Sequence, residues 1–144
     1  MTLDNDNWLL LVGEADGEPR TYRIRQGIPD GVARETFTEC VIIEWRYADR
    51  GFPDKRMTSL HNAFEGILDA LNDPKGNSML AHAYTGGGIK EWCYYAKNYD
   101  RFMAHLNEVL AGKPRFPIEI VHDEDPTWKY WTGIREFAMN AAEA

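Results

Sequence analysis

The chain has 144 residues, of which 44% are hydrophobic, and this size and composition are typical of one domain with a single core. The longest apolar run, Trp8 to Val12, is far shorter than the roughly 18 residues that a membrane-spanning helix needs. We therefore expect a single domain over residues 1–144, with no membrane partner. The formal net charge is −7. Because nucleic-acid binding depends on Lys and Arg that neutralise phosphates, we expect no nucleic-acid partner.

Two features predict the cellular location. Residues 1–7 are acidic and polar, without the basic region that opens a secretory signal. Cys40 and Cys93 lie in strand-like runs and have no neighbouring Cys or His at metal-ligand spacing. We expect two buried, reduced thiols, and a disulfide between strands is the alternative. Together these features predict a cytoplasmic protein.

The N-terminal third is predicted to form strands. Two β-prone runs, 8–14 and 21–26, flank Asp16–Gly17, a pair typical of a tight hairpin turn. A loop rich in Gly and Pro follows over residues 27–35. Residues 40–47 then alternate between apolar and polar, which predicts a half-buried strand. Its apolar side carries Val41, Ile43, Trp45 and Tyr47.

A helix and a second hairpin are predicted next. Apolar residues recur at steps of three and four after a turn at 51–54, which predicts an amphipathic helix that ends at Asp73–Pro74. Its apolar stripe consists of Met57, Leu60, Phe64, Ile67, Leu68 and Leu71. The strand-like runs 78–84 and 89–97 are separated by Gly86 to Gly88, which can adopt the positive φ of a hairpin turn.

The remaining residues predict a helix, a strand and a helix. Asn98 is the expected N-cap of a helix that ends before Gly112, and residues 116–120 form the last strand. Asp125–Pro126 predicts the N-cap and first residue of the final helix. The predicted fold class is therefore α+β, with a ferredoxin-like βαββαβ core from residue 40, an added N-terminal β-hairpin and a C-terminal helix.

Two local motifs have a functional and a structural interpretation. Phosphate-binding glycine loops lead into a helix, whereas a strand follows Gly86 to Gly88, so a hairpin turn is favoured. His122 to Asp125 contains one imidazole and three carboxylates, which could bind a divalent cation through oxygen ligands. The alternative assigns Asp125 to helix capping and leaves the others solvated. The four histidines show no catalytic signature, and we expect no catalytic residue, metal or cofactor.

Aromatic residues provide the candidate binding surface. Strand alternation places Trp92 and Tyr94 on one side of the sheet and Cys93 and Tyr95 on the other. Two helices on one face cannot cover both pairs. One of the two pairs is therefore either covered by the hairpin or the last helix, or exposed as a partner surface. The candidate binding residues are Tyr84, Trp92, Tyr94, His122, Asp123 and Trp128.

Several segments carry a resemblance to a known family. The most specific are AYTGGGIKEWCYYA at 83–96, FPIEI at 116–120 and DEDPTWKY at 123–130. Further matching segments in the N-terminal half are Trp8, 16–19, 43–47 and 51–54. The chain thereby resembles the uncharacterised domain of unknown function 695 family over nearly its whole length, which implies a fold but no activity. Its Asp-Pro-x-Trp element is also similar to inhibitors of ribonuclease E, small acidic ferredoxin-like regulators that bind a protein.

Two functional hypotheses follow. The first is a non-catalytic protein-interaction or regulatory module of the cytoplasm, indicated by the acidic charge, the aromatic residues and the missing catalytic motifs. The second is a small enzyme or ligand-binding protein with a pocket between the sheet and the 125–137 helix, using His122, Asp123 or Tyr84. A deep pocket with converging polar groups favours the second hypothesis, and a closed apolar junction excludes it. The sequence does not specify the oligomeric state.

Overall fold

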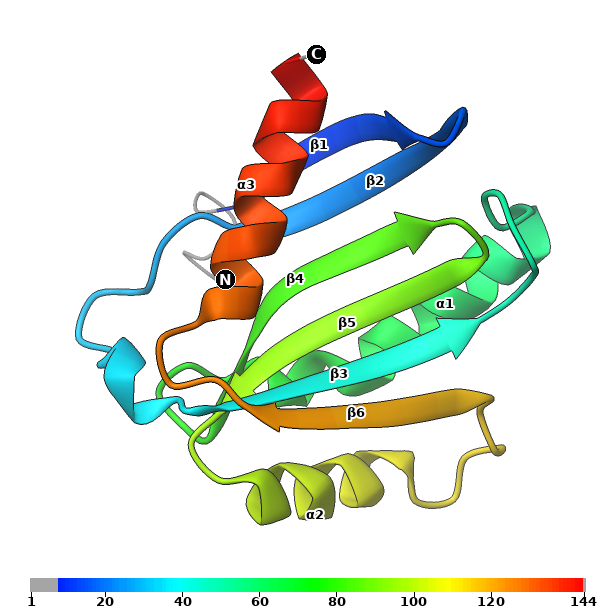
Figure 1. The fold of residues 1–144 in the computed structure, drawn as a ribbon. Coiled ribbons are helices and arrows are strands. Elements are labelled where there is room, and N and C mark those ends of the chain that lie inside the picture. The colour runs from blue at the N-terminus through cyan, green and yellow to red at the C-terminus, as the bar shows by residue number, and fades with distance from the viewer. Residues whose placement is uncertain (1–7, 144) are drawn as a thin grey trace.

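A computed structural model describes the backbone of residues 8–143 and the side chains of residues 8–140. Within this range the chain forms one six-stranded antiparallel sheet and three α-helices (Figure 1). The predicted α+β class is therefore confirmed. None of the helices between residues 8 and 143 combines the length and the hydropathy that crossing a membrane requires.

The elements occur in the predicted order. The strands are β1 (Trp8–Ala15), β2 (Glu18–Arg25), β3 (Glu39–Arg46), β4 (Ser78–Gly86), β5 (Ile89–Ala96) and β6 (Ile118–Glu124). The α-helices are α1 (Lys55–Leu68), α2 (Tyr99–Leu110) and α3 (Lys129–Glu143). The described residues also contain the short 3₁₀ helices η2 (Arg34–Thr36) and η3 (Asp69–Leu71), and η3 directly follows α1.

The sheet has the strand order β1-β2-β4-β5-β3-β6, and every neighbouring pair is antiparallel. The N-terminal hairpin is part of this sheet, because β2 pairs with β4. The strand order thus differs from that of a four-stranded ferredoxin-like sheet. Pairing with β2 satisfies backbone groups that β4 would otherwise present at an open edge.

Local sequence explains the predicted turns and helix starts. Asp16 and Gly17 have φ angles of 55° and 77°, the positive values that the tightest hairpin turns require. The Asp54 carboxylate accepts a hydrogen bond of 2.8 Å from the backbone N–H of Met57 and caps α1. Asn98 caps α2 as predicted, by accepting a 2.8 Å hydrogen bond from the N–H of Arg101.

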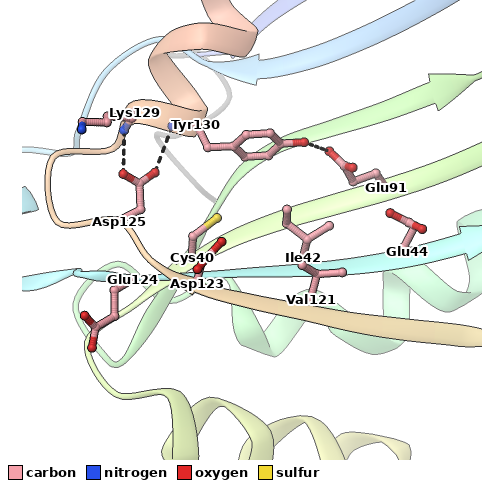
Figure 2. A pocket seen from close by; sticks show the side chains of 10 residues that line it. All are labelled: Cys40, Ile42, Glu44, Glu91, Val121, Asp123, Glu124, Asp125, Lys129 and Tyr130. Carbon is pink, nitrogen blue, oxygen red and sulfur yellow. Dashed lines mark hydrogen bonds between the residues drawn. The ribbon is translucent and has the colours of Figure 1, made fainter.

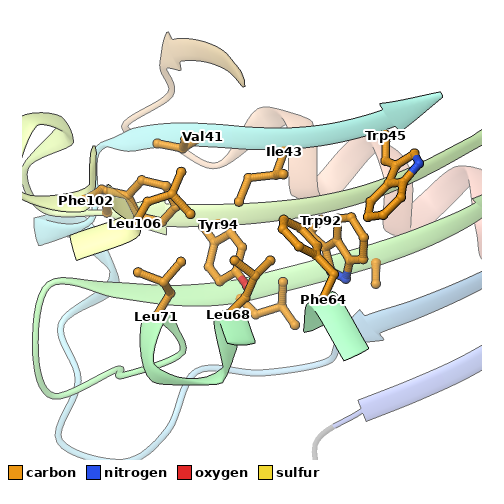
Figure 3. Packing of buried hydrophobic residues seen from close by; sticks show 13 residues of the cluster. Val41, Ile43, Trp45, Phe64, Leu68, Leu71, Trp92, Tyr94, Phe102 and Leu106 are labelled. Atoms are coloured by element: carbon orange, nitrogen blue, oxygen red, sulfur yellow. The ribbon is translucent and has the colours of Figure 1, made fainter. Parts of the chain in front are cut away.

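Helices α1 and α2 cover one face of the sheet and bury the larger hydrophobic cluster (Figure 3). Trp92 and Tyr94 lie in this cluster and are 0% and 1% exposed. The predicted α1 stripe is wrong at one position, because Leu60 is 40% exposed while its neighbour His61 is only 3% exposed. The imidazole packs edge-on against Trp45, with ring centroids 4.8 Å apart, and so takes a core position beside an aromatic partner.

The buried His61 predicts a pH-dependent stability. Burial, assisted by the charge of Lys90, lowers the pKa of this imidazole from 6.5 to about 4. Between these values the unfolded chain binds more protons than the folded chain, so stability falls as the pH falls. The expected loss between pH 7 and pH 5 is about 2 kcal/mol from this group. Urea denaturation at both pH values measures it, and His61→Phe, which cannot titrate, should show a correspondingly smaller loss. An unchanged pH dependence in the variant would contradict this assignment.

Helix α3 covers part of the opposite face, over the β1, β2 and β4 side (Figure 1). The second hydrophobic cluster lies beneath it, where the rings of Tyr95 and Trp128 stack with centroids 3.9 Å apart. Cys93 and Tyr95 are both fully buried there. Each aromatic pair of β5 is therefore covered by the chain itself, and neither forms an exposed partner surface.

The start of α3 corrects a prediction. The helix begins at Lys129, so the prediction that Pro126 is its first residue is wrong. Trp128 has a φ of 59°, in the left-handed region, which turns its side chain inward before the helix starts. Its indole N–H donates to the carbonyl of Phe37 over 2.9 Å. Burial of this tryptophan thus delays the helix by three residues relative to the sequence prediction.

Candidate functional site

Helix α3 leaves part of its face of the sheet uncovered. This part contains a cavity of about 530 Å³ between the N-terminal turn of α3 and strands β3, β5 and β6 (Figure 2). Strand alternation brings residues from these three strands to one surface. The lining residues are Cys40, Ile42, Glu44, Glu91, Val121, Asp123, Glu124, Asp125, Lys129 and Tyr130. We call this cavity the acidic pocket, because its lining has five carboxylates and one ammonium group.

The floor of the acidic pocket is apolar. Ile42 on β3 lies directly opposite Val121 on β6, and Val121 is 44% exposed. Cys40 completes the floor, and its sulfur lies 3.6 Å from that of Cys93. Both cysteines are free and buried, which confirms the prediction of reduced thiols. Burial, together with the neighbouring Cys40 thiol, raises the pKa of Cys93 well above its ordinary value, so this sulfur stays a thiol.

Three glutamates form a row across the sheet beside this floor. Glu44 on β3 pairs directly with Glu91 on β5 and, on its other side, with Glu119 on β6. Directly opposed residues of antiparallel strands project from the same face, so three like charges stand side by side. Neither Glu44 nor Glu119 forms an ion pair with any other described residue. Such a row lowers stability, since opposed like charges repel.

Glu91 is the one member of the glutamate row whose carboxylate forms hydrogen bonds with other described side chains. Glu91 accepts a 2.9 Å hydrogen bond from the hydroxyl of Tyr130 (Figure 2). Its carboxylate also lies 2.7 Å from Nε2 of His82. The His82 side chain is completely buried. The burial of Tyr130, together with the negative charge of Glu91, raises the pKa of the Tyr130 hydroxyl. Tyr130 therefore remains a hydroxyl donor that positions the Glu91 carboxylate at the edge of the pocket.

Asp125 organises the α3 end of the pocket. Its carboxylate accepts hydrogen bonds from the backbone N–H groups of Lys129 and Tyr130, at 2.8 and 2.9 Å (Figure 2). It accepts a third hydrogen bond from the Tyr95 hydroxyl, at 2.6 Å. Burial acts to raise the pKa of Asp125, but these hydrogen bonds outweigh it and lower the pKa below its ordinary value. The predicted capping role of Asp125 is confirmed, although the helix it caps begins later.

The chain matches the sequence model of a protein family over most of its length. The model of a family described as Family of unknown function (DUF695) matches residues 6–134. The chain belongs to this DUF695 family. The resemblance predicted from the sequence is confirmed, and it covers the whole sheet and the pocket but not the end of α3. A search of curated proteins found no match.

In this DUF695 domain the predicted candidate residues do not form one site. Asp123 lines the acidic pocket, but its neighbour His122 lies on the opposite face. There His122 stacks on Tyr99 with centroids 3.7 Å apart, and its Nε2 lies 2.6 Å from a Glu39 oxygen. Among the side chains described, no three or more His, Cys, Asp or Glu are grouped so that they could hold a metal ion.

The other candidate binding residues of the DUF695 domain are buried or form a hydrogen bond within the domain. Trp92, Tyr94 and Trp128 are at most 1% exposed and fill the two clusters. Tyr84 is half-buried and accepts a hydrogen bond from the Arg20 guanidinium. It lies opposite Glu91 in the sheet, but it does not line the acidic pocket.

Sequence reasoning missed most of the pocket. The alternation of residues 40–47 places Glu44 on the polar side of its strand, but no local motif marks Glu44, Glu91, Glu119 or Tyr130 as site residues. Alternation alone places a glutamate on a face, but it does not give the strand register. The row becomes visible only when β3 is known to lie between β5 and β6.

Proposed function

We propose that this domain is a non-catalytic protein-interaction module whose acidic pocket binds an Arg- or Lys-bearing segment of a partner protein. The observation that carries the proposal is the row of Glu91, Glu44 and Glu119 on the uncovered face. A protein retains a destabilising charge arrangement where function requires it, and a cationic partner would neutralise this one.

The shape of the pocket suits a long basic side chain. Arg and Lys carry an aliphatic stem that packs on apolar surface while the charged head reaches a carboxylate. Ile42 and Val121 offer that apolar surface next to Glu44. Glu91, oriented by Tyr130, provides a carboxylate whose position is already set before a partner arrives.

The test is binding of a fluorescent hexa-arginine peptide at 0.15 M salt. We expect Glu44→Gln with Glu119→Gln to weaken binding about tenfold or more, because two carboxylates of the row are neutralised. The same double variant should unfold no more easily than the parent, and removing the two opposed pairs, Glu44–Glu91 and Glu44–Glu119, should stabilise it by roughly 0.2–1 kcal/mol for each pair. Loss of binding together with retained stability separates a binding role from a structural one.

A matched control changes the net charge equally at other places. Glu35 and Glu108 are exposed and lie outside the acidic pocket. Glu35→Gln with Glu108→Gln should change the affinity by about twofold or less, since charges beyond about 8 Å are screened at this salt concentration. If both double variants weaken binding equally, the peptide is attracted only by the net charge, and the proposal is wrong.

A second candidate function is a small ligand-binding protein or enzyme, the alternative predicted from the sequence. It is supported by the cavity between the sheet and α3, in which Glu44, Glu91, Asp123 and Tyr130 converge. The acidic lining would select a small amine. Spermidine binding as tightly as the hexa-arginine peptide, with the same sensitivity to Glu44→Gln, would favour this candidate over a partner protein.

We propose a cytoplasmic location and a ferredoxin-like relationship for the core. The two free cysteines support the former, because thiols persist in a reducing compartment. Support for the latter is the chain order β3-α1-β4-β5-α2-β6, together with the neighbour order β6-β3-β5-β4 of those strands.

A further inference from the structure

A second cavity, of about 220 Å³, lies on the α1 side of the sheet, where α1 passes strands β2, β4 and β5. Its polar lining differs from that of the acidic pocket, because it contains no carboxylate. The polar side chains are Thr21, Thr58, His61, Asn62, Thr85 and Lys90. Phe52 and Pro53 form the remaining, apolar wall. We call it the lysine cavity.

Lys90 is the one charged residue of this lining and has unused donors. Its ammonium donates to the hydroxyl of Thr85 over 2.9 Å and lies 5.6 Å from the ring centre of Trp92. No carboxylate among the described residues lies within 4 Å of it. An ammonium group has three N–H donors, so two remain for a ligand.

The carboxylate that attracts Lys90 already has other hydrogen-bond donors. Glu65 attracts Lys90 electrostatically, yet its carboxylate accepts hydrogen bonds from Arg23 at 2.8 Å and from the indole of Trp92 at 2.7 Å. Burial lowers the pKa of Lys90, because its charge has lost water without gaining a directly bonded anion. A bound anion would provide the directly bonded negative charge that the Lys90 ammonium lacks.

His61 provides a second unsatisfied group. Its side chain is 3% exposed and lines the lysine cavity, and its Nε2 is buried without a hydrogen-bond partner among the described residues. Buried polar atoms are normally paired, so an orphaned one beside a cavity indicates a site for a ligand group. The imidazole is neutral at pH 7, and in the tautomer with the proton on Nε2 it is a donor.

We propose that the lysine cavity binds a small organic carboxylate. The carboxylate accepts hydrogen bonds from the Lys90 ammonium, from Nε2–H of His61 and from the threonine hydroxyls. The apolar part of the acid contacts Phe52 and Pro53. This site is independent of the acidic pocket, because the two lie on opposite faces of the sheet and share no lining residue.

Sodium benzoate is the probe, and its neutral isostere benzamide is the control ligand. We expect benzoate to cause saturable shifts of the backbone amide resonances of Thr85 and Lys90 and of the His61 ring resonances in two-dimensional NMR spectra. Benzamide should bind at least about tenfold more weakly, because it lacks the charge that pairs with Lys90. Shifts that do not saturate, or equal affinity for both compounds, would overturn the proposal.

Variants locate the binding. Lys90→Met should weaken benzoate binding about tenfold or more, whereas Lys113→Met, an exposed lysine after α2, should change it about twofold or less. If Lys90→Met does not fold, Thr21→Val serves instead and should weaken binding by removing one hydroxyl donor. Equal affinity of the parent and a folded Lys90→Met or Thr21→Val variant would show that benzoate binds elsewhere and would overturn the proposal.

Discussion

Replacing Trp128 with Ala is expected to lower the free energy of unfolding by about 3 to 5 kcal/mol, the usual cost of truncating a buried Trp. The indole is 0% exposed and stacks on Tyr95 with an interplanar angle of 8°. Its N–H donates to the Phe37 carbonyl, so the substitution also leaves that acceptor buried without its partner. Several elements lose contacts at once, because Phe37 precedes β3, Tyr95 lies on β5 and Trp128 directly precedes α3.

Urea denaturation followed by far-UV circular dichroism measures this change. Phe137→Ala is the matched control, since it truncates an aromatic residue within α3 that is 52% exposed. It should cost about 1 kcal/mol or less, because a half-exposed ring loses less buried area. A Trp128→Ala variant as stable as Phe137→Ala would show that α3 is not anchored through Trp128.

Gly88→Ala is expected to lower the free energy of unfolding by roughly 2 to 4 kcal/mol. Gly88 has a φ of 87°, which already disfavours a side chain. A Cβ atom there would lie 2.2 Å from the carbonyl oxygen of Ala48, a backbone atom that cannot rotate away. The same residue donates from its N–H to the Gly51 carbonyl and accepts from the N–H of Tyr47, at 3.0 and 2.9 Å. A shift that relieves the clash would break these bonds.

Gly17→Ala separates the cost of the positive φ from the cost of the Cβ clash. Gly17 also lies in a hairpin turn and has a φ of 77°, but a Cβ atom there would have nothing within 4 Å. Its substitution should cost only the backbone strain, about 1 to 2 kcal/mol. Chemical denaturation of both variants gives the difference. Equal losses would mean that the close approach of Ala48 contributes nothing, contrary to the geometry described.

The triglycine segment is accordingly explained by structure rather than by phosphate binding. Gly86, Gly87 and Gly88 all have positive φ, as the sequence predicted for a hairpin turn between β4 and β5. Gly88 has a second role that the sequence does not indicate. It holds the loop over residues 47–51 against the end of the sheet, which is a contact between segments about 40 residues apart.

The two cavities give the domain opposite electrostatic properties on its two faces. The acidic pocket has unpaired carboxylates over an apolar floor, whereas the lysine cavity has one ammonium among hydroxyls. Among the described residues, Glu44 of the acidic pocket and Lys90 of the lysine cavity form no ion pair. Unpaired charges do not stabilise a fold, and for this reason we propose a ligand for each cavity.

Much of the fold was predictable, because local rules determine local structure. The period of two in β3, the period of 3.6 in α1 and α2, and the caps Asp54 and Asn98 depend only on nearby residues. The errors arose where long-range packing overrode a local signal. His61, rather than the predicted Leu60, lies in the core because it packs against Trp45. Helix α3 begins later than predicted because Trp128 turns inward and stacks on Tyr95.

The sequence by itself determined the α+β class, the order of strands and helices, the tight turns and the family. These follow from composition, periodicity and short motifs, which do not depend on how strands are paired. Only the tertiary structure decided that the hairpin extends the sheet beside β4, that α3 covers part of one face, and that Glu91, Glu44 and Glu119 stand in a row. Strand order and register are set by contacts between distant segments, and alternation assigns a residue to a face without naming its neighbours.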